Sequence, residues 1–116
     1  MKDSDGQGMG GADGGERASP SLDNILKALN HPLRRGILRR FHQHETGGRS
    51  PVELARELNK PLSKVGYHVR VLAKKGLIGL TDELPTRGSV EHVYASNVAG
   101  DQQVESILIK SKAEDE

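Results

Sequence analysis

Residues 62–75 combine two kinds of side chain at the spacing of a helix. Val65, Val69 and Leu72 recur every three or four positions, which places them on one side of that helix. The other side carries hydroxyl, amine and guanidinium groups and one glycine, from Ser63, Lys64, Gly66, Tyr67 and Arg70. Such groups form hydrogen bonds with the edges of DNA bases, and a major groove admits one helix. We therefore predict a DNA-contacting surface here.

Within this surface we assign different roles to different residues. Ser63, Lys64 and Tyr67 are expected to face bases, and Arg70 is expected to reach a guanine or a phosphate. A glycine inside a helix costs about 1 kcal/mol relative to alanine, so Gly66 requires a reason. Close approach to DNA is one such reason, and tight packing against another helix is the alternative.

The preceding segment predicts a second short helix. Ser50, Pro51 and Glu53 form an N-cap, a first-turn proline and a capping-box carboxylate, which together start a helix at Pro51. Leu54, Ala55 and Leu58 then share one face, and residues 59–61 separate this helix from the next. Two short helices joined by a tight turn form a helix-turn-helix.

The rest of the chain predicts a mainly α fold with one small antiparallel β-hairpin. Apolar spacing indicates helices at about 21–30 and 32–44, and a weak final helix at about 101–110. The second of these helices is expected to bury Leu33, Ile37, Leu38 and Phe41. Gly76 has the place of a left-handed cap, before strands at 77–81 and 89–95 and a loop at 83–88. The two strands and their loop would form a wing.

Composition divides the chain into a core and two acidic tails. Residues 1–20 are rich in Gly, Asp and Ser and are expected to be disordered, and residues 111–116 are expected to fray. Residues 22–99 hold 13 Lys or Arg against 7 Asp or Glu, a net charge of +6, whereas 1–21 carry −2 and 100–116 carry −3. The predicted domain at 21–96 is therefore basic and suits a polyanion, although mildly basic domains also exist without nucleic-acid partners.

Four more cations are candidates for phosphate contacts. Lys74 and Lys75 end the predicted DNA-contacting helix, Arg49 precedes the helix-turn-helix, and Arg87 lies at the tip of the wing. The alternative for each is an ordinary solvated position. The second helix carries four further arginines, Arg34, Arg35, Arg39 and Arg40. They could contact DNA, pair with Glu45 and Glu57, or remain exposed to solvent on the helix surface, and we favour the last.

A lean core suggests a partner subunit. Aromatic residues make up only 3% of the chain, so a second copy is expected to complete the packing. The first and last predicted helices each carry an apolar stripe that could form the interface with this second copy. The residues are Leu22, Ile25, Leu26, Leu29, Val104, Ile107 and Leu108. Either the last helix packs on the first within one chain, or both pack against a second copy.

Other chemistry is disfavoured. The chain has no cysteine, which excludes disulfides and thiolate metal sites. His42 and His44 are two positions apart and point to different sides of a helix end, so a solvated terminus is favoured over a metal site, and His68 is expected to form a hydrogen bond at the edge of the core. We expect no cofactor, no metal and no enzymatic activity. No secretory or membrane-spanning segment is evident, so the expected location is the cytoplasm.

In this order of elements the chain resembles the winged helix-turn-helix regulators of the ArsR type, over residues 22–94. The resemblance lies in LKALNHPLRRGILRRF, SPVELARELNKPLSKVGYHVRVLAKKGLI and GSVEHVYA. The chain is most similar to a branch of this family whose members have no obvious metal site. The resemblance implies a dimer that lays each recognition helix in a major groove, with the wing tip on the neighbouring backbone.

Taken together, these features predict a dimeric, sequence-specific DNA-binding regulator, most simply a repressor that occludes a promoter. Two alternatives remain open. A winged helix can serve as a protein-interaction module, because a fold does not dictate its function. A small molecule or a phosphorylation could also bias the geometry of a dimer, which would make the chain a sensor with DNA binding secondary.

Overall fold

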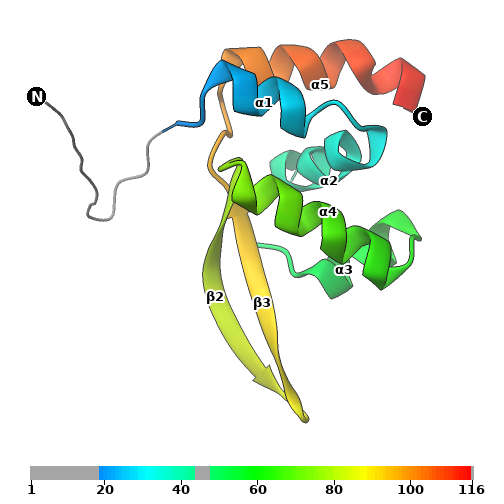
Figure 1. The fold of residues 1–116 in the computed structure, drawn as a ribbon. Coiled ribbons are helices and arrows are strands. Elements are labelled where there is room, and N and C mark those ends of the chain that lie inside the picture. The colour runs from blue at the N-terminus through cyan, green and yellow to red at the C-terminus, as the bar shows by residue number, and fades with distance from the viewer. Residues whose placement is uncertain (1–18, 44–47, 116) are drawn as a thin grey trace, which may run out of the picture.

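The computed structural model describes residues 19–43 and 48–115. Over these residues the chain forms five helices and a two-stranded antiparallel sheet (Figure 1). The elements in chain order are α1 (Leu22–Ala28), α2 (Pro32–Gln43), α3 (Pro51–Leu58), α4 (Leu62–Lys74), β2 (Ile78–Thr86), β3 (Ser89–Ser96) and α5 (Gln102–Asp115). The predicted tail at 1–20, except for its last two residues, lies outside the described residues, as does His44.

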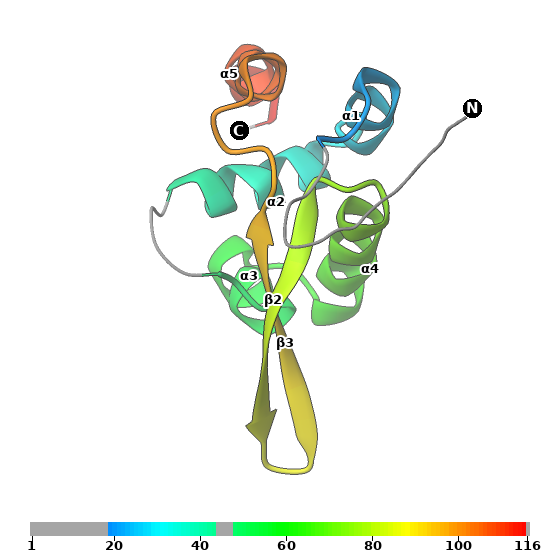
Figure 2. The same cartoon turned by 90° about the vertical axis from the view of Figure 1, so that its left-hand side faces the viewer.

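Helix α2 lies at the centre of the molecule. It contacts α3, α4, α5 and β3, and its Ile37 and Leu38 are fully buried. Helices α1 and α5 lie at one end of the molecule and the hairpin projects from the other (Figures 1 and 2). The two ends therefore offer separate surfaces.

Local sequence signals set the ends of α3 as predicted. The Ser50 side chain accepts a hydrogen bond from the Glu53 amide, and the Glu53 carboxylate accepts one from the Ser50 amide, which completes the capping box. Asn59 ends the helix in the left-handed conformation with φ of 56°. Because α4 begins three residues later, the turn of the helix-turn-helix is short. The apolar faces are also as predicted, since Leu54, Val65, Val69 and Leu72 are buried.

The hairpin is longer than the sequence analysis predicts. The predicted loop at 83–88 is wrong, because β2 continues to Thr86 and only two residues, Arg87 and Gly88, connect the strands. Pro85 is tolerated because a two-stranded ribbon has free edges where its missing N–H is not needed. One extra residue, Thr81, interrupts the register between the Leu80 and Asp82 pairs and forms a bulge.

Helix α5 extends five residues past the predicted end at 110, to Asp115. It packs on α2, and its Val104 and Leu108 are buried in the same core as Ile25 and Leu29 of α1. The reason for the extension is electrostatic. Side chains of α2 bind the last turns of α5, including Ser111 and Asp115.

Three of the four arginines of α2 differ from the favoured interpretation of solvated charges, and the guanidinium of the fourth, Arg40, has among the described residues one hydrogen-bond partner, Gln43 of its own helix. Arg35 and Arg39 both form ion pairs with Asp115, at 2.7 and 2.8 Å. Arg34 donates from Nε to the carbonyl oxygen of Ala28 at 2.6 Å. The helix periodicity correctly places these residues beside the apolar stripe, but it contains no information on partners as distant as Asp115.

His42 is also not a solvated helix end. Only 10% of its side chain is exposed, and its Nδ1 lies 2.8 Å from the Glu105 carboxylate. Its Nε2 shares a 2.7 Å hydrogen bond with the Ser96 hydroxyl. His42 thus connects α2 to the end of β3 and to α5. Among the described residues, no cluster of three or more side chains suits a metal ion, and no helix is long and apolar enough to cross a membrane.

Candidate nucleic-acid interface

Helix α4 presents a polar surface on the side away from the core. Tyr67 is 54% exposed, and Ser63, Lys64, Arg70 and Lys74 are exposed with it. The buried side carries Val65, Val69 and Leu72, and packs on α2 and α3. The predicted division of this helix into a core face and an outer face is therefore present in the structure.

The outer residues of α4 lie on two flanks. Ser63, Gly66 and Arg70 line a groove between α4 and the hairpin. Opposite them, the groove is bordered by Pro51 and by His92 and Tyr94 of β3. The sequence analysis does not identify His92 as part of this surface, because its place depends on how the hairpin packs against α4.

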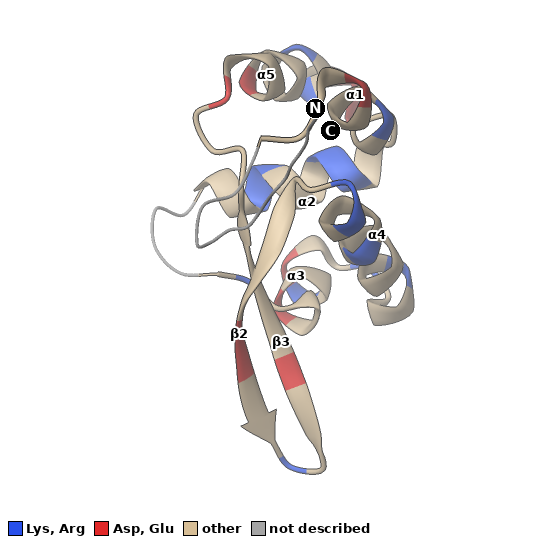
Figure 3. Cartoon of the chain, turned by 60° about the vertical axis from the view of Figure 1, so that its left-hand side comes forward, with Lys and Arg blue, Asp and Glu red and all other residues tan. Residues whose placement is uncertain are grey.

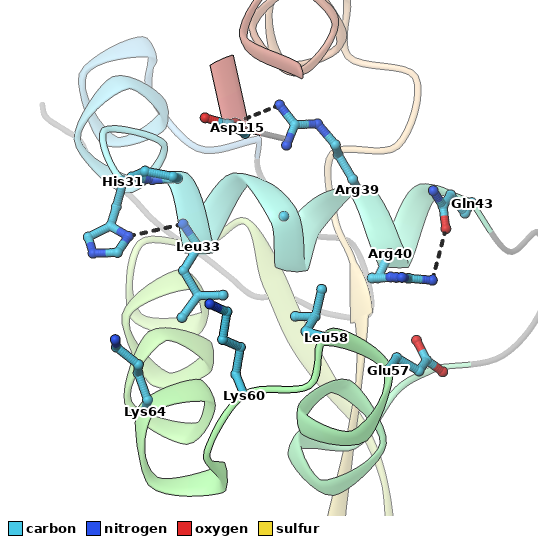
Figure 4. Close-up of a pocket in the computed structure, with 12 residues that line it drawn as sticks. His31, Leu33, Arg39, Arg40, Gln43, Glu57, Leu58, Lys60, Lys64 and Asp115 are labelled. Atoms are coloured by element: carbon cyan, nitrogen blue, oxygen red, sulfur yellow. Dashed lines mark hydrogen bonds and ion pairs between the residues drawn. The ribbon is translucent and has the colours of Figure 1, made fainter. Parts of the chain in front are cut away.

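The other flank faces α2. Lys64 and Lys60 border a hollow between α2 and the α3–α4 turn, shown in Figure 4. Their ammonium groups form no ion pair with another described residue, so both charges are available to an anion. Lys64 and Arg70 therefore point to opposite flanks of one helix, and a duplex seated on α4 would meet both.

Gly66 is buried, yet none of the described residues requires it to be glycine. A Cβ atom at this position would meet only the Arg70 guanidinium, at an ordinary distance of 3.5 Å. Packing against another helix of the same chain is therefore not the reason for Gly66. Close approach by an outside molecule stays a prediction.

Two of the candidate cations outside α4, Arg87 and Arg49, differ in availability. Arg87 lies at the exposed tip of the hairpin, where Figure 3 shows a cationic segment far from the acidic positions of the strands. Arg49 is mostly covered, with 16% of its side chain exposed and its Nε 3.4 Å from the Glu57 carboxylate. Its backbone forms a bridge to Tyr94 of β3. A phosphate contact by Arg49 would therefore require it to leave Glu57.

A pair of histidines lies beneath the α2 flank of α4. The rings of His31 and His68 are 4.3 Å apart, centre to centre. His31 accepts a hydrogen bond at Nδ1 from the Leu33 amide at 3.1 Å, and Nδ1 of His68 lies 3.5 Å from a guanidinium nitrogen of Arg34. Since a protonated imidazole has no acceptor, this arrangement suits two neutral rings. The contact with Arg34 agrees with the predicted hydrogen-bonding role of His68.

Burial and neighbouring cations both lower the pKa values of His31 and His68. Desolvation is the main cause that lowers the pKa of His68, and the charges of His31, Arg34 and Lys64 add to it. The pKa of His31 is lowered in the same way, by desolvation and then by Arg34, Lys64 and Arg35. Both rings therefore stay uncharged at neutral pH.

The predicted dimer residues fall into two groups. Ile25, Leu29, Val104 and Leu108 are buried within the chain's own core. Leu22 and Leu26 of α1 remain 46% and 52% exposed, and Ile107 is partly buried. Ile109, which the sequence analysis does not select, is 72% exposed.

Comparisons with known proteins agree with this geometry. Residues 29–80 match the sequence family described as a helix-turn-helix domain. No curated protein matches the sequence significantly.

Solved structures share the fold. The transcriptional repressor PagR of Bacillus anthracis is 22% identical, with a TM-score of 0.56 over 77% of this chain and 93% of that chain. The homodimeric winged helix-turn-helix DNA-binding domain Mb0332 from Mycobacterium bovis is 18% identical, with a TM-score of 0.56 over 79% of this chain and 75% of that chain. A structure described as an ArsR family transcriptional regulator is 25% identical, with a TM-score of 0.52 over 80% of this chain and 84% of that chain.

The helix-turn-helix match and the winged fold together define the class of protein, a winged helix-turn-helix protein, and the chain shares this fold with structures described as ArsR-family regulators. The solved structures that share this fold are described as a transcriptional repressor and as a transcriptional regulator.

Proposed function

We propose that this chain is a homodimeric repressor that places α4 in the major groove of a specific operator and rests the hairpin tip on the adjacent backbone. The observation that carries the proposal is the outer surface of α4, where hydroxyl, amine and guanidinium groups are exposed on a helix whose other side is buried. A helix anchored in this way is rigid enough to hold its side chains against base edges.

The residues of this surface divide by role. Ser63, Tyr67 and Arg70 are exposed where a base edge could be reached. Lys64, which the sequence analysis expects to face bases, lies on the α2 flank, and we assign it with Lys74 and Arg87 to the phosphates, where contacts fix the register without reading sequence. Gly66 would let the duplex approach the groove between α4 and the hairpin.

The dimer is proposed from the opposite end of the molecule. Among the exposed large apolar side chains, Leu22 and Leu26 lie on α1 and Ile109 lies on α5, and these two helices are at the end of the molecule away from the hairpin (Figures 1 and 2). Ile107 borders a shallow groove with Leu26 between these two helices. A second copy seated there leaves both α4 helices free, as binding to two half-sites of an operator requires.

A repressor also needs cellular DNA as its partner, which places the proposed activity in the cytoplasm. The two candidate partners are therefore double-stranded DNA and a second copy of the chain.

The test is binding of the full chain to DNA. Genomic fragments retained by the protein are sequenced, and the enriched site is measured by fluorescence anisotropy against a shuffled duplex of equal length. We expect the enriched site to bind at least about 1000-fold more tightly than the shuffled one at physiological salt. The logarithm of the affinity should fall linearly with the logarithm of salt concentration, with a slope of about −0.9 per phosphate contacted. Equal affinity for both duplexes would contradict specific recognition, and a flat salt response would contradict DNA binding itself.

A further inference from the structure

The hairpin is fastened to the start of α3 by a carboxylate on β3. The Ser50 hydroxyl donates a short hydrogen bond to Oε2 of Glu91. The same hydroxyl oxygen accepts the Glu53 amide at 3.2 Å as the N-cap of α3. Because Ser50 is fully buried, this one hydroxyl is held both by the helix and by the hairpin.

Backbone contacts beside Ser50 reinforce the connection. Arg49 and Tyr94 exchange two backbone hydrogen bonds, of 2.8 and 2.9 Å. Gly48 passes so close to β3 that a Cβ there would lie 2.6 Å from Cγ1 of Val93 and closer still to the Tyr94 carbonyl oxygen. Segment 48–50 therefore lies against β3 at the point where the hairpin leaves the body of the protein.

Glu91 has a distinct place in this contact. Arg49 and Tyr94 pin the base of the strand, whereas Glu91 is three residues further along β3, toward the exposed tip. Its carboxylate also lies at the amino-terminal end of α3, where the unpaired amides favour a negative charge. The backbone bridge and the contacts of α2 and α4 hold the base of the hairpin, and the Glu91 contact adds a point of attachment nearer the tip.

From this geometry, we propose that Glu91 is a positioning residue that sets the angle between the hairpin and the helix-turn-helix. It does so through Ser50, and it would thereby place Arg87 on the DNA backbone while α4 occupies the groove. The consequence for DNA rests on the proposed function. The positioning itself does not, since it concerns the free protein.

The first arm of the test measures the angle without DNA. The chain has no cysteine, so spin labels can be attached at Arg56→Cys on α3 and at Ser89→Cys near the hairpin tip. Both positions are exposed. Pulsed electron–electron double resonance then gives the distribution of distances between the two labels. Unlabelled protein is added in excess to suppress signals between copies of a dimer. We expect Glu91→Leu to broaden or shift the distribution, and Glu91→Gln, whose amide oxygen still accepts from Ser50, to restore it.

Two further variants keep this arm decisive. Glu91→Asp shortens the side chain by one methylene while keeping its charge, and should shift the distribution even if Glu91→Leu does not fold. Glu83→Leu is the control, because it removes another carboxylate of the same hairpin. The Glu83 carboxylate lies 3.5 Å from His92 and not against α3, so this variant should leave the distance distribution unchanged. Wild-type distributions for both Glu91→Leu and Glu91→Asp would overturn the proposal.

The second arm uses the enriched duplex. If Glu91 acts by placing Arg87, then Glu91→Leu should lower the salt slope by about 0.9, as loss of one phosphate contact does. In an Arg87→Ala background, Glu91→Leu should change the affinity by less than about twofold, because the contact is already lost. A full additional loss in that background would contradict action through Arg87. If the wild-type chain binds no DNA, the proposed function fails, and the distance distributions still decide the role of Glu91.

Discussion

Arg35 and Asp115 face each other across 80 positions of sequence and join through two parallel hydrogen bonds. Nε of Arg35 donates to Oδ2 at 2.8 Å and Nη2 donates to Oδ1 at 2.7 Å. Arg39 adds a third bond to the same carboxylate at 2.8 Å. Only 5% of the Asp115 side chain is exposed, so the last turn of α5 is fixed to α2 by a nearly buried cluster of charges.

Asp115→Asn should destabilise the protein by about 3–5 kcal/mol, because it leaves two mostly covered guanidinium groups without their anion. Urea unfolding followed by circular dichroism measures this loss. Asp23→Asn is the matched control, since Asp23 pairs with Lys27 on the exposed surface of α1 and should matter little. Equal unfolding midpoints for Asp115→Asn and the wild type would refute the role of the cluster.

The same carboxylate predicts sensitivity to acid. The guanidinium groups of Arg35 and Arg39 hold the pKa of Asp115 far below its ordinary value of 3.8. Because the unfolded chain takes up this proton first, the stabilisation is complete above pH 3.8 and is lost as the pH falls below it. The free energy of unfolding should therefore decrease more steeply below pH 3.8 in the wild type than in Asp115→Asn.

The histidine pair predicts a second dependence on pH, in a higher range. Both pKa values are lowered from 6.5 by burial and by nearby cations, so the unfolded chain binds more protons below pH 6.5 than the folded one does. The contribution of this pair to stability should be complete above pH 6.5 and should be lost as the pH falls below it. His68→Gln, which offers Arg34 an acceptor that does not titrate, should flatten this decrease. His92→Gln on the exposed hairpin should not, and identical profiles for the two variants would contradict the prediction.

Gly48 and Gly36 should respond in opposite ways to alanine. At Gly48 the new methyl group would collide with Val93 and Tyr94 of β3, while at Gly36 it would meet nothing within 4 Å. We expect Gly48→Ala to cost about 1–3 kcal/mol through overpacking. Gly36→Ala, in the interior of α2, should gain about 1 kcal/mol. Thermal unfolding of both variants provides the measurement, and a stabilised Gly48→Ala would contradict the close passage of the chain past β3.

Gly66→Ala should separate stability from DNA binding. The variant should be about 1 kcal/mol more stable, since a methyl group there meets only the Arg70 side chain. Its affinity for the enriched duplex should nevertheless decrease, because the methyl group would occupy space in the groove beside the hairpin. Unchanged affinity would remove Gly66 from the proposed interface, and Arg70→Ala, with an expected loss of about 1–3 kcal/mol at the preferred site, calibrates the assay.

Sequence alone predicts the features that depend on near neighbours in the chain. The start of α3 follows from Ser50, Pro51 and Glu53, and the buried face of α4 follows from the spacing of Val65, Val69 and Leu72. The contacts that the sequence does not predict join distant segments. Ser50 meets Glu91 across 41 positions, and Arg39 meets Asp115 across 76. Helix periodicity identifies such side chains as polar but carries no information on which distant group satisfies them.

The sequence separation between Arg35 and Asp115 also has a consequence for synthesis on the ribosome. At about 5–20 residues per second, the 80 intervening positions take roughly 4–16 s to translate. During that interval, α2 exists without the anion that neutralises its guanidinium groups. The helix-turn-helix and hairpin are complete by residue 96, so α5 is added to the nascent chain after both of them.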